Sequence, residues 1–116
     1  MFDQTSFIPT DELNNFRDRI QRVARDKIAP QAPWVDEEEF FNREVESVLW
    51  DLGLLTLTFP ERYRGYGKDR MVALCIAVEE IAKVCASSAL LLIIQAVGSF
   101  PIIHGGSNKL KQKYEM

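Results

Sequence analysis

Few side chains in this 116-residue chain could do chemistry, and none has a partner at a recognisable spacing. His104 is the single histidine, so a catalytic triad or a Cys–His pair would have to be assembled by the fold. We expect it at a helix end, in polar packing or exposed. Glu79 and Glu80 could be a paired acid and base, but adjacent helical residues point about 100° apart. They are interpreted as a polar face, and no catalytic residue is predicted.

The two cysteines indicate a compartment rather than a site. Cys75 and Cys85 stand ten residues apart on one predicted helical stretch, about 15 Å along a helix axis and too far for a disulfide. Neither has the spacing of a metal ligand, so no metal site is predicted. They are interpreted as buried thiols in a reducing compartment. Because the first residues also show no secretory signal, we expect a cytoplasmic protein.

Length and composition favour one soluble globular domain over residues 1–116. Hydrophobic residues make up 47% and charged residues 27% of the chain, which is ordinary for such a domain. A chain of this length can bury one real core. The net charge of -3 argues against a nucleic-acid binder, which would normally present a basic face.

The long apolar segment 71–103 is the element around which the rest must pack. Because serine caps helices better than it continues them, we expect a break near 85–88 and two helices, at about Met71–Val84 and Ser88–Ile103. Pro101 should kink or shorten the second helix. In the first helix, the spacing predicts one buried face and one polar face. The buried face comprises Leu74, Val78, Ile81 and Ala82, opposite Glu79, Glu80 and Lys83.

The second helix is apolar almost all round between Ala89 and Val97, so we expect it to be buried on every side. A membrane span is the alternative, because 84–103 carries no charge and is long enough. Polar residues within that window and the lack of a basic cluster before it argue against a span. A strand over 89–94 is a further alternative, but no second long strand could pair with it.

The N-terminal half predicts two more helices and a connector. Thr10 should cap a helix that ends near Pro30, followed by a linker over Trp34–Phe41. Its core stripe comprises Leu13, Phe16, Ile20, Val23, Ala24 and Ile28. Asn42 should cap the next helix, which ends at Gly53 in the left-handed conformation. The buried face of that helix comprises Val45, Val48, Leu49 and Leu52.

Period-two alternation then predicts an extended segment, Leu55–Phe59, before a turn-rich loop over 61–67. Near the C-terminus, Gly105–Gly106 should end the apolar helix and Ser107 should cap a last helix, Asn108–Tyr114. The predicted fold is therefore all-α: a compact helical bundle of about five helices with one short extended segment around Leu55–Phe59.

Four motifs follow one another in a set order: VARDKIAP at 23–30, LGLL with FPERYRGYG between 52 and 67, VEEIAKVCAS at 78–87, and PIIHGGS with KQKY between 101 and 114. Their order and spacing resemble the N-terminal α-helical domain of the acyl-CoA dehydrogenase family. Departures from the family pattern fall at Arg64, at Cys85 and at Glu115–Met116.

The resemblance implies fatty acid metabolism: FAD-dependent α,β-dehydrogenation of an acyl-CoA thioester, with electron-transfer flavoprotein as the partner. In the family, a middle β-domain holds much of the flavin site, and a C-terminal helical domain carries the catalytic glutamate. Neither is present in this chain. The resemblance therefore implies a flavoprotein oxidoreductase as the parent, and a chain that alone binds no FAD and is inactive.

The resemblance also implies a wall of the acyl cavity on the helix before the Pro101–Ile103 segment. By register, the acyl-tail wall residues are Ala89, Ile93, Ile94 and Val97. Longer-chain members tend to have a small residue at the position of Ile94, so a branched side chain there implies a short or branched acyl substrate. Ordinary core packing of these four residues is the open alternative.

The alternative function, from another class, is a stand-alone helical interaction module without catalytic activity. In either case, faces that would cover the missing domains are expected to be exposed apolar patches. Such patches drive association, so we expect self-association of the isolated chain, by helix exchange as one route.

Overall fold

The computed structural model describes residues 10–39, 42–60, 65 and 69–115, and every regular element within those ranges is helical. This confirms the all-α prediction. One short helix, α2, was not expected. The α-helices are α1 (Asp11–Val23), α2 (Ala32–Glu38), α3 (Arg43–Asp51), α4 (Arg70–Ala82), α5 (Ala86–Gly105) and α6 (Asn108–Glu115).

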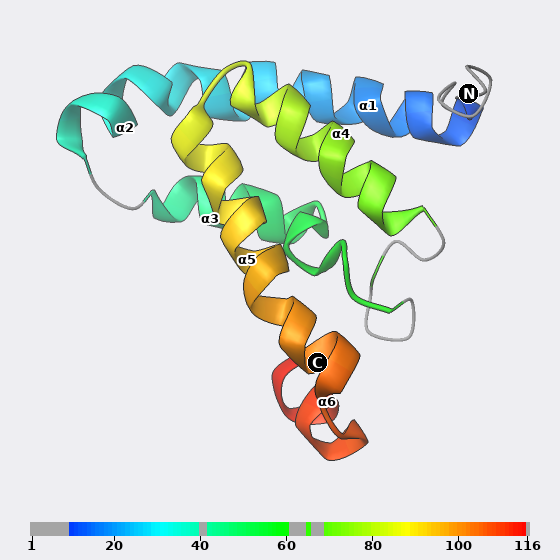
Figure 1. Cartoon of the computed structure of the whole chain (residues 1–116). Helices are drawn as coiled ribbons and strands as arrows, with labels where there is room; N and C mark the ends of the chain where they lie inside the picture. The colour runs from blue at the N-terminus through cyan, green and yellow to red at the C-terminus, as the bar shows by residue number, and fades with distance from the viewer. Residues whose placement is uncertain (1–9, 40–41, 61–64, 66–68, 116) are drawn as a thin grey trace, which may run out of the picture.

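The helices form two crossed groups. Figure 1 shows α1 and α4 running side by side, while α5 descends from the end of α4 and crosses α3. The contacts of α4 with α1 and with α5 are the most extensive between helices. The small helix α6 lies beside the C-terminal end of α5, away from α2. The main core lies where α1, α3, α4 and α5 meet.

The start of α1 and its buried stripe match the prediction. The Thr10 hydroxyl accepts a hydrogen bond from the Leu13 backbone N–H at 3.2 Å, which satisfies a free donor of the first turn. The stripe is buried at five of its six positions, and Val23 is half-buried. Leu13, Phe16, Ile20, Ala24 and Ile28 are the five.

The predicted linker over 34–41 is wrong. The chain loosens into a π-turn at Ala24–Ile28 and a 3-10 turn at Ala29–Gln31, and then continues as α2. Pro33 lies in the first turn of α2, where its missing N–H needs no partner. The helix ends at Glu39, whose φ of 54° is left-handed. Residues 40–41 lie outside the described residues.

The predicted cap and end of α3 are both confirmed. The Asn42 side chain accepts hydrogen bonds from the backbone N–H groups of Glu44 and Val45, at 2.9 and 3.3 Å. Val45 and Leu49 are buried, and Gly53 has a φ of 73°.

The predicted extended segment at Leu55–Phe59 is wrong. The backbone forms a 3-10 turn at Leu54–Thr56 and then turns again. Alternation misled because both sets of side chains are inside: Thr56 and Thr58 are buried with Leu57. The loop predicted over 61–67 lies outside the described residues except Gly65. A Cβ at Gly65 would lie 1.5 Å from the Phe59 carbonyl oxygen, so this close approach requires glycine.

The buried face of α4 is rotated from the predicted one. Ala82 is exposed, Leu74 and Val78 are only half-buried, and Glu80 is buried. The helix packs against α1 on one side and α5 on another, so its buried face is wide. The buried set comprises Ala73, Ile76, Ala77, Glu80 and Ile81.

The segment after the break is a helix, as predicted, but it is not buried on every side. The chain breaks at Lys83–Cys85, and Cys85 rather than a serine takes the cap position of α5. The inner face is buried and comprises Ser88, Ala89, Leu92, Ala96, Ser99 and Ile103. The opposite face is exposed. Pro101 does not shorten the helix, which continues to Gly105.

Within the described chain, α5 is the one helix long and apolar enough to cross a membrane. Only 33% of its most apolar window is buried. Length and composition alone also fit the core helix of a soluble protein, so this property assigns no membrane location.

Candidate functional site

Four apolar side chains of α5 point away from the core and form what we call the outer face of α5. They are Leu90, Ile93, Ile94 and Val97. Their positions repeat at three, four and seven residues, which is one side of a helix. Ile94 is the most exposed, at 60%, and Ile93 the least, at 39%. Contiguous exposed apolar surface of this kind marks a contact site for a ligand or a protein.

The structure places three of the four predicted acyl-tail wall residues on this outer face. Ile93, Ile94 and Val97 lie together there, whereas Ala89 is 2% exposed and belongs to the core. The described residues thus bring three of them to one surface and hold Ala89 on the inner side of α5. Their role toward an acyl chain stays a prediction.

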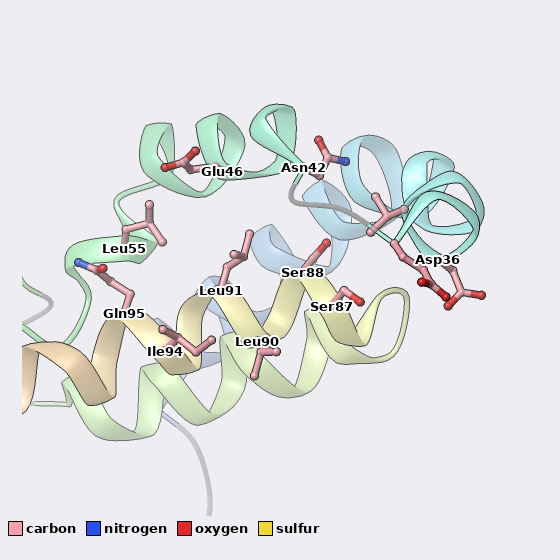
Figure 2. Close-up of a pocket in the computed structure, with 12 residues that line it drawn as sticks. Asp36, Asn42, Glu46, Leu55, Ser87, Ser88, Leu90, Leu91, Ile94 and Gln95 are labelled. Carbon is pink, nitrogen blue, oxygen red and sulfur yellow. The ribbon is translucent and has the colours of Figure 1, made fainter.

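A groove lies between α2, α3 and the first half of α5, and it shares Leu90 and Ile94 with the outer face. Its volume is about 650 Å³, within the range of small-molecule sites. Figure 2 shows Leu91 extending from α5 toward the α3 side, with Asp36 at the end formed by α2. The described lining residues are Val35, Asp36, Glu39, Asn42, Glu46, Leu55, Ser87, Ser88, Leu90, Leu91, Ile94 and Gln95.

The groove has an apolar floor and an acidic rim. The floor comes from Leu55 and from the leucines and isoleucine of α5, and the rim carries Asp36, Glu39 and Glu46. None of its described lining residues is lysine or arginine. Glu46 pairs with Arg43 at 3.1 Å, and exposed pairs of this kind contribute little.

This charge does not suit the diphosphate of a flavin dinucleotide, because anionic rim groups would repel it. Among the described residues we therefore assign no FAD contact to the groove.

The groove is not predicted from the sequence, because a linker over 34–41 would leave it without the wall that α2 forms. Proline near the start of a helix was the available signal: Pro33 followed by Trp34 and Val35 is compatible with a first helical turn. If 34–41 were a linker, Asp36 and Glu39 would not be expected to line a groove.

A buried carboxylate joins α1 to α4. Glu80 is only 3% exposed, and it accepts hydrogen bonds from Arg17 Nη1 and, at 3.1 Å, from Lys83 Nζ. Arg17 also reaches Glu79 at 3.4 Å. Burial alone raises the pKa of Glu80, but hydrogen bonds from Lys83, Arg17 and Gln21 outweigh it, so its pKa lies below the usual value. The hydrogen bond to Glu80 correspondingly raises the pKa of Arg17.

The prediction that Glu79 and Glu80 form one polar face is therefore half wrong. Glu79 is exposed, whereas Glu80 points at α1. The cluster is away from the groove and holds two helices together, so its arrangement is that of a structural ion pair rather than an acid–base site.

Among the described residues, the remaining candidate groups show no arrangement suited to catalysis. Cys75 is exposed, contrary to the prediction of a buried thiol, and Cys85 is half-buried; both are free. The Ser88 hydroxyl donates to Cys85 Sγ at 3.1 Å. His104 is exposed, as one of the two expected environments, with its ring 6.0 Å from that of Phe100. The described residues contain no cluster able to hold a metal ion.

The comparisons with known proteins agree with this helical architecture. The family described as "Acyl-CoA dehydrogenase, N-terminal domain" matches residues 10–115. Cyclohexane-1-carbonyl-CoA dehydrogenase of Geobacter metallireducens is 50% identical over 107 residues, which cover 92% of this chain and 28% of the relative. The enzyme of that name from Syntrophus aciditrophicus is also 50% identical, over 101 residues, 87% of this chain and 26% of its own length.

A relative with a different name is more distant. Cyclohex-1-ene-1-carbonyl-CoA dehydrogenase of Geobacter metallireducens is 41% identical over 105 residues, covering 90% of this chain and 27% of its own. The chain thus spans little more than a quarter of the length of these relatives.

Proposed function

Because the chain belongs to the acyl-CoA dehydrogenase family, as its N-terminal domain, we propose that it forms one wall of the acyl cavity in an FAD-dependent acyl-CoA dehydrogenase. The observation that carries the proposal is the outer face of α5. A row of branched apolar side chains left open to solvent is suited to contact an apolar substrate tail.

The substrate proposed for the parent enzyme is a compact acyl-CoA thioester, short or branched. The branched side chain of Ile94 stands out from α5 and would occupy space that a longer chain needs. The names of the two relatives with 50% identity specify a cyclohexane-1-carbonyl group, which is compact and branched at the carbon that carries the carbonyl. Both arguments point to a bulky rather than a long acyl group.

The flavin belongs to the parent enzyme and not to this chain alone. The groove between α2, α3 and α5 is acidic, which does not suit a dinucleotide diphosphate. In the complete enzyme, FAD would accept the hydride from the substrate, and electron-transfer flavoprotein would accept the electrons from the reduced flavin. The chain alone should neither bind FAD nor dehydrogenate an acyl-CoA.

The isolated chain is proposed to self-associate in the cytoplasm. Self-association is supported by the exposed outer face of α5, because association removes apolar surface from water. A cytoplasmic location is supported by the two free cysteines, which suit a reducing compartment.

The decisive experiment compares this chain with the complete enzyme. Each is purified, examined for bound flavin by its visible spectrum, and assayed with cyclohexane-1-carbonyl-CoA, isobutyryl-CoA and palmitoyl-CoA. We expect a colourless, inactive chain and a yellow enzyme that favours the first two substrates. A complete enzyme that prefers palmitoyl-CoA would contradict the proposed substrate class, and one that dehydrogenates none of the three would contradict the proposed function.

A further inference from the structure

The helix α6 is a small basic amphipathic surface. Leu110 and Tyr114 are exposed and lie four residues apart, so they share one side of the helix. Lysines flank that side, Lys109 and Lys113 on one edge and Lys111 on the other. Its sequence carries three lysines and one glutamate. The Ser107 hydroxyl caps the helix by accepting from the Leu110 N–H at 3.2 Å, as the sequence predicts.

The groove between α2, α3 and α5 has the complementary pattern. Its floor is apolar, and its rim carries three carboxylates from two helices and the helix end between them, with no described lysine or arginine in its lining. An apolar helix stripe laid in an apolar groove, with lysines meeting carboxylates at the edges, is a general mode of helix recognition. Both halves of this pattern are present on the same chain.

A chain cannot place α6 in its own groove. The groove lies along the first half of α5, and its last α5 residue is Gln95. Ten further residues, or about 15 Å of helix, separate Gln95 from Gly105. Only Gly106 and Ser107 connect the helices, and α6 itself is about 12 Å long. Folded back along α5, it would stop short of the groove, and Figure 1 shows it at the opposite end.

We propose that the groove receives α6 of a second copy of this chain, and that two copies exchange their α6 helices reciprocally. Each chain has one α6 and one such groove in its described part, so a reciprocal pair fills both and closes as a two-fold dimer. This inference rests on the proposed self-association and adds which surfaces meet. Leu90 and Ile94 of the outer face also line the groove and are then covered by α6, whereas Ile93 and Val97 lie outside the groove lining.

The test is charge exchange, measured by sedimentation equilibrium of the full chain. Lys109→Glu/Lys113→Glu should weaken the dimer at least about tenfold in Kd. Asp36→Lys/Glu39→Lys should do the same, and these lysines near the C-terminal end of α2 are compatible with its dipole. In an equimolar mixture of the two variants, a heterodimer should regain both contacts, because its acidic α6 meets the basic groove and its basic α6 meets the acidic groove. The quadruple variant should regain both contacts in a homodimer.

Matched controls reverse exposed charges elsewhere on α1 and the turn after it: Asp18→Lys and Lys27→Glu. They should leave the dimer unchanged. Raising NaCl from about 0.05 to about 0.5 M should weaken the wild-type dimer, because salt screens exposed charges. Circular dichroism of every variant checks that the helices persist.

Three results would overturn the inference. A wild-type chain that stays monomeric at high concentration excludes both the dimer and the self-association. A dimer that is insensitive to charge reversal, or that strengthens with salt, places the contact instead on the part of the outer face outside the groove, at Ile93 and Val97. Failure of the quadruple variant to associate excludes the lysine–carboxylate pairing. None of these results bears on the dehydrogenase proposal, which flavin binding and turnover of the complete enzyme test separately.

Discussion

The contact between α1 and α4, which we call the seam, differs from the outer face of α5 in how far the chain itself covers its side chains. In the seam, Ile20 and Ala77 are fully buried, and even the carboxylate of Glu80 finds cationic partners within the chain. On the outer face, branched apolar side chains such as Ile94 and Val97 are more than half exposed. The seam is therefore buried by residues of this chain, whereas the exposed apolar outer face is suited to contact another molecule.

The largest expected effect comes from shortening one side chain on each of the two sides of α5. Leu92→Ala removes a side chain that is 1% exposed and should lower the free energy of unfolding by about 2–4 kcal/mol. Ile94→Ala, two residues away on the outer face, should change it by no more than about 0.5 kcal/mol. Urea unfolding at one low protein concentration measures both. Equal losses would mean that the outer face is also packed.

The seam itself is tested by neutralising its buried carboxylate. Glu80→Gln keeps the shape but loses the charge that Arg17 and Lys83 bind, so we expect a loss of about 1–3 kcal/mol. Because Arg17 is partly exposed, the loss of stability should be smaller than the loss on breaking a fully buried ion pair. The control is Glu79→Gln, whose side chain is 57% exposed and should matter little. An unchanged free energy of unfolding in Glu80→Gln would show that the ion pair contributes no net stability.

The same carboxylate predicts how stability depends on pH. The pKa of Glu80 is lower in the folded chain than in the unfolded chain. Its contribution is therefore present above the unfolded value, near pH 4.5, and is lost as the pH falls through the folded value. Urea titrations between pH 7 and pH 3 should show a steeper loss in the wild type than in Glu80→Gln. Parallel curves would contradict this assignment of the acid sensitivity.

Two helix caps, one at the start of α1 and one at the start of α3 beside the groove, give the smallest expected effects. Asn42 is buried beside the groove, accepts from two backbone N–H groups and donates to Gln31, so Asn42→Ala should cost about 1–2 kcal/mol. Thr10 makes one such bond at an exposed start of α1, and Thr10→Ala should cost about 0.5–1 kcal/mol. Thermal unfolding of the pair checks the order. The reverse order would show that the groove side is the less tightly held.

Periodicity and capping were sufficient to predict α1, α3 and α6 from sequence. Each has a side-chain cap at its first turn, at Thr10, Asn42 and Ser107, and α1 and α3 each have a regular apolar stripe. These are local signals that depend on neighbours three or four residues away. The helix α2 lacks such a cap and carries an acidic run, so the same signals failed there.

The features that sequence reasoning could not supply depend on distant partners. Glu80 is buried because Arg17, 63 residues earlier in the chain, reaches it; the pattern around Glu80 alone predicts a solvent-facing acid. The apolar composition of α5 predicts burial on every side. Composition does not reveal whether the residues that bury the helix come from this chain or from a partner. The alternation at Leu55–Phe59 also failed as a signal, because Thr56 and Thr58 are buried as well as Leu57.

The most direct test of the central claim, that the outer face of α5 borders the acyl chain, uses Ile94 in the complete enzyme. Ile94→Ala opens space on that face, and Leu110→Ala, on α6, is the control. We predict that Ile94→Ala raises kcat/KM for longer straight-chain acyl-CoA relative to cyclohexane-1-carbonyl-CoA by about tenfold, while the control leaves the ratio unchanged. A chain-length profile that Ile94→Ala leaves unaltered would contradict the claim.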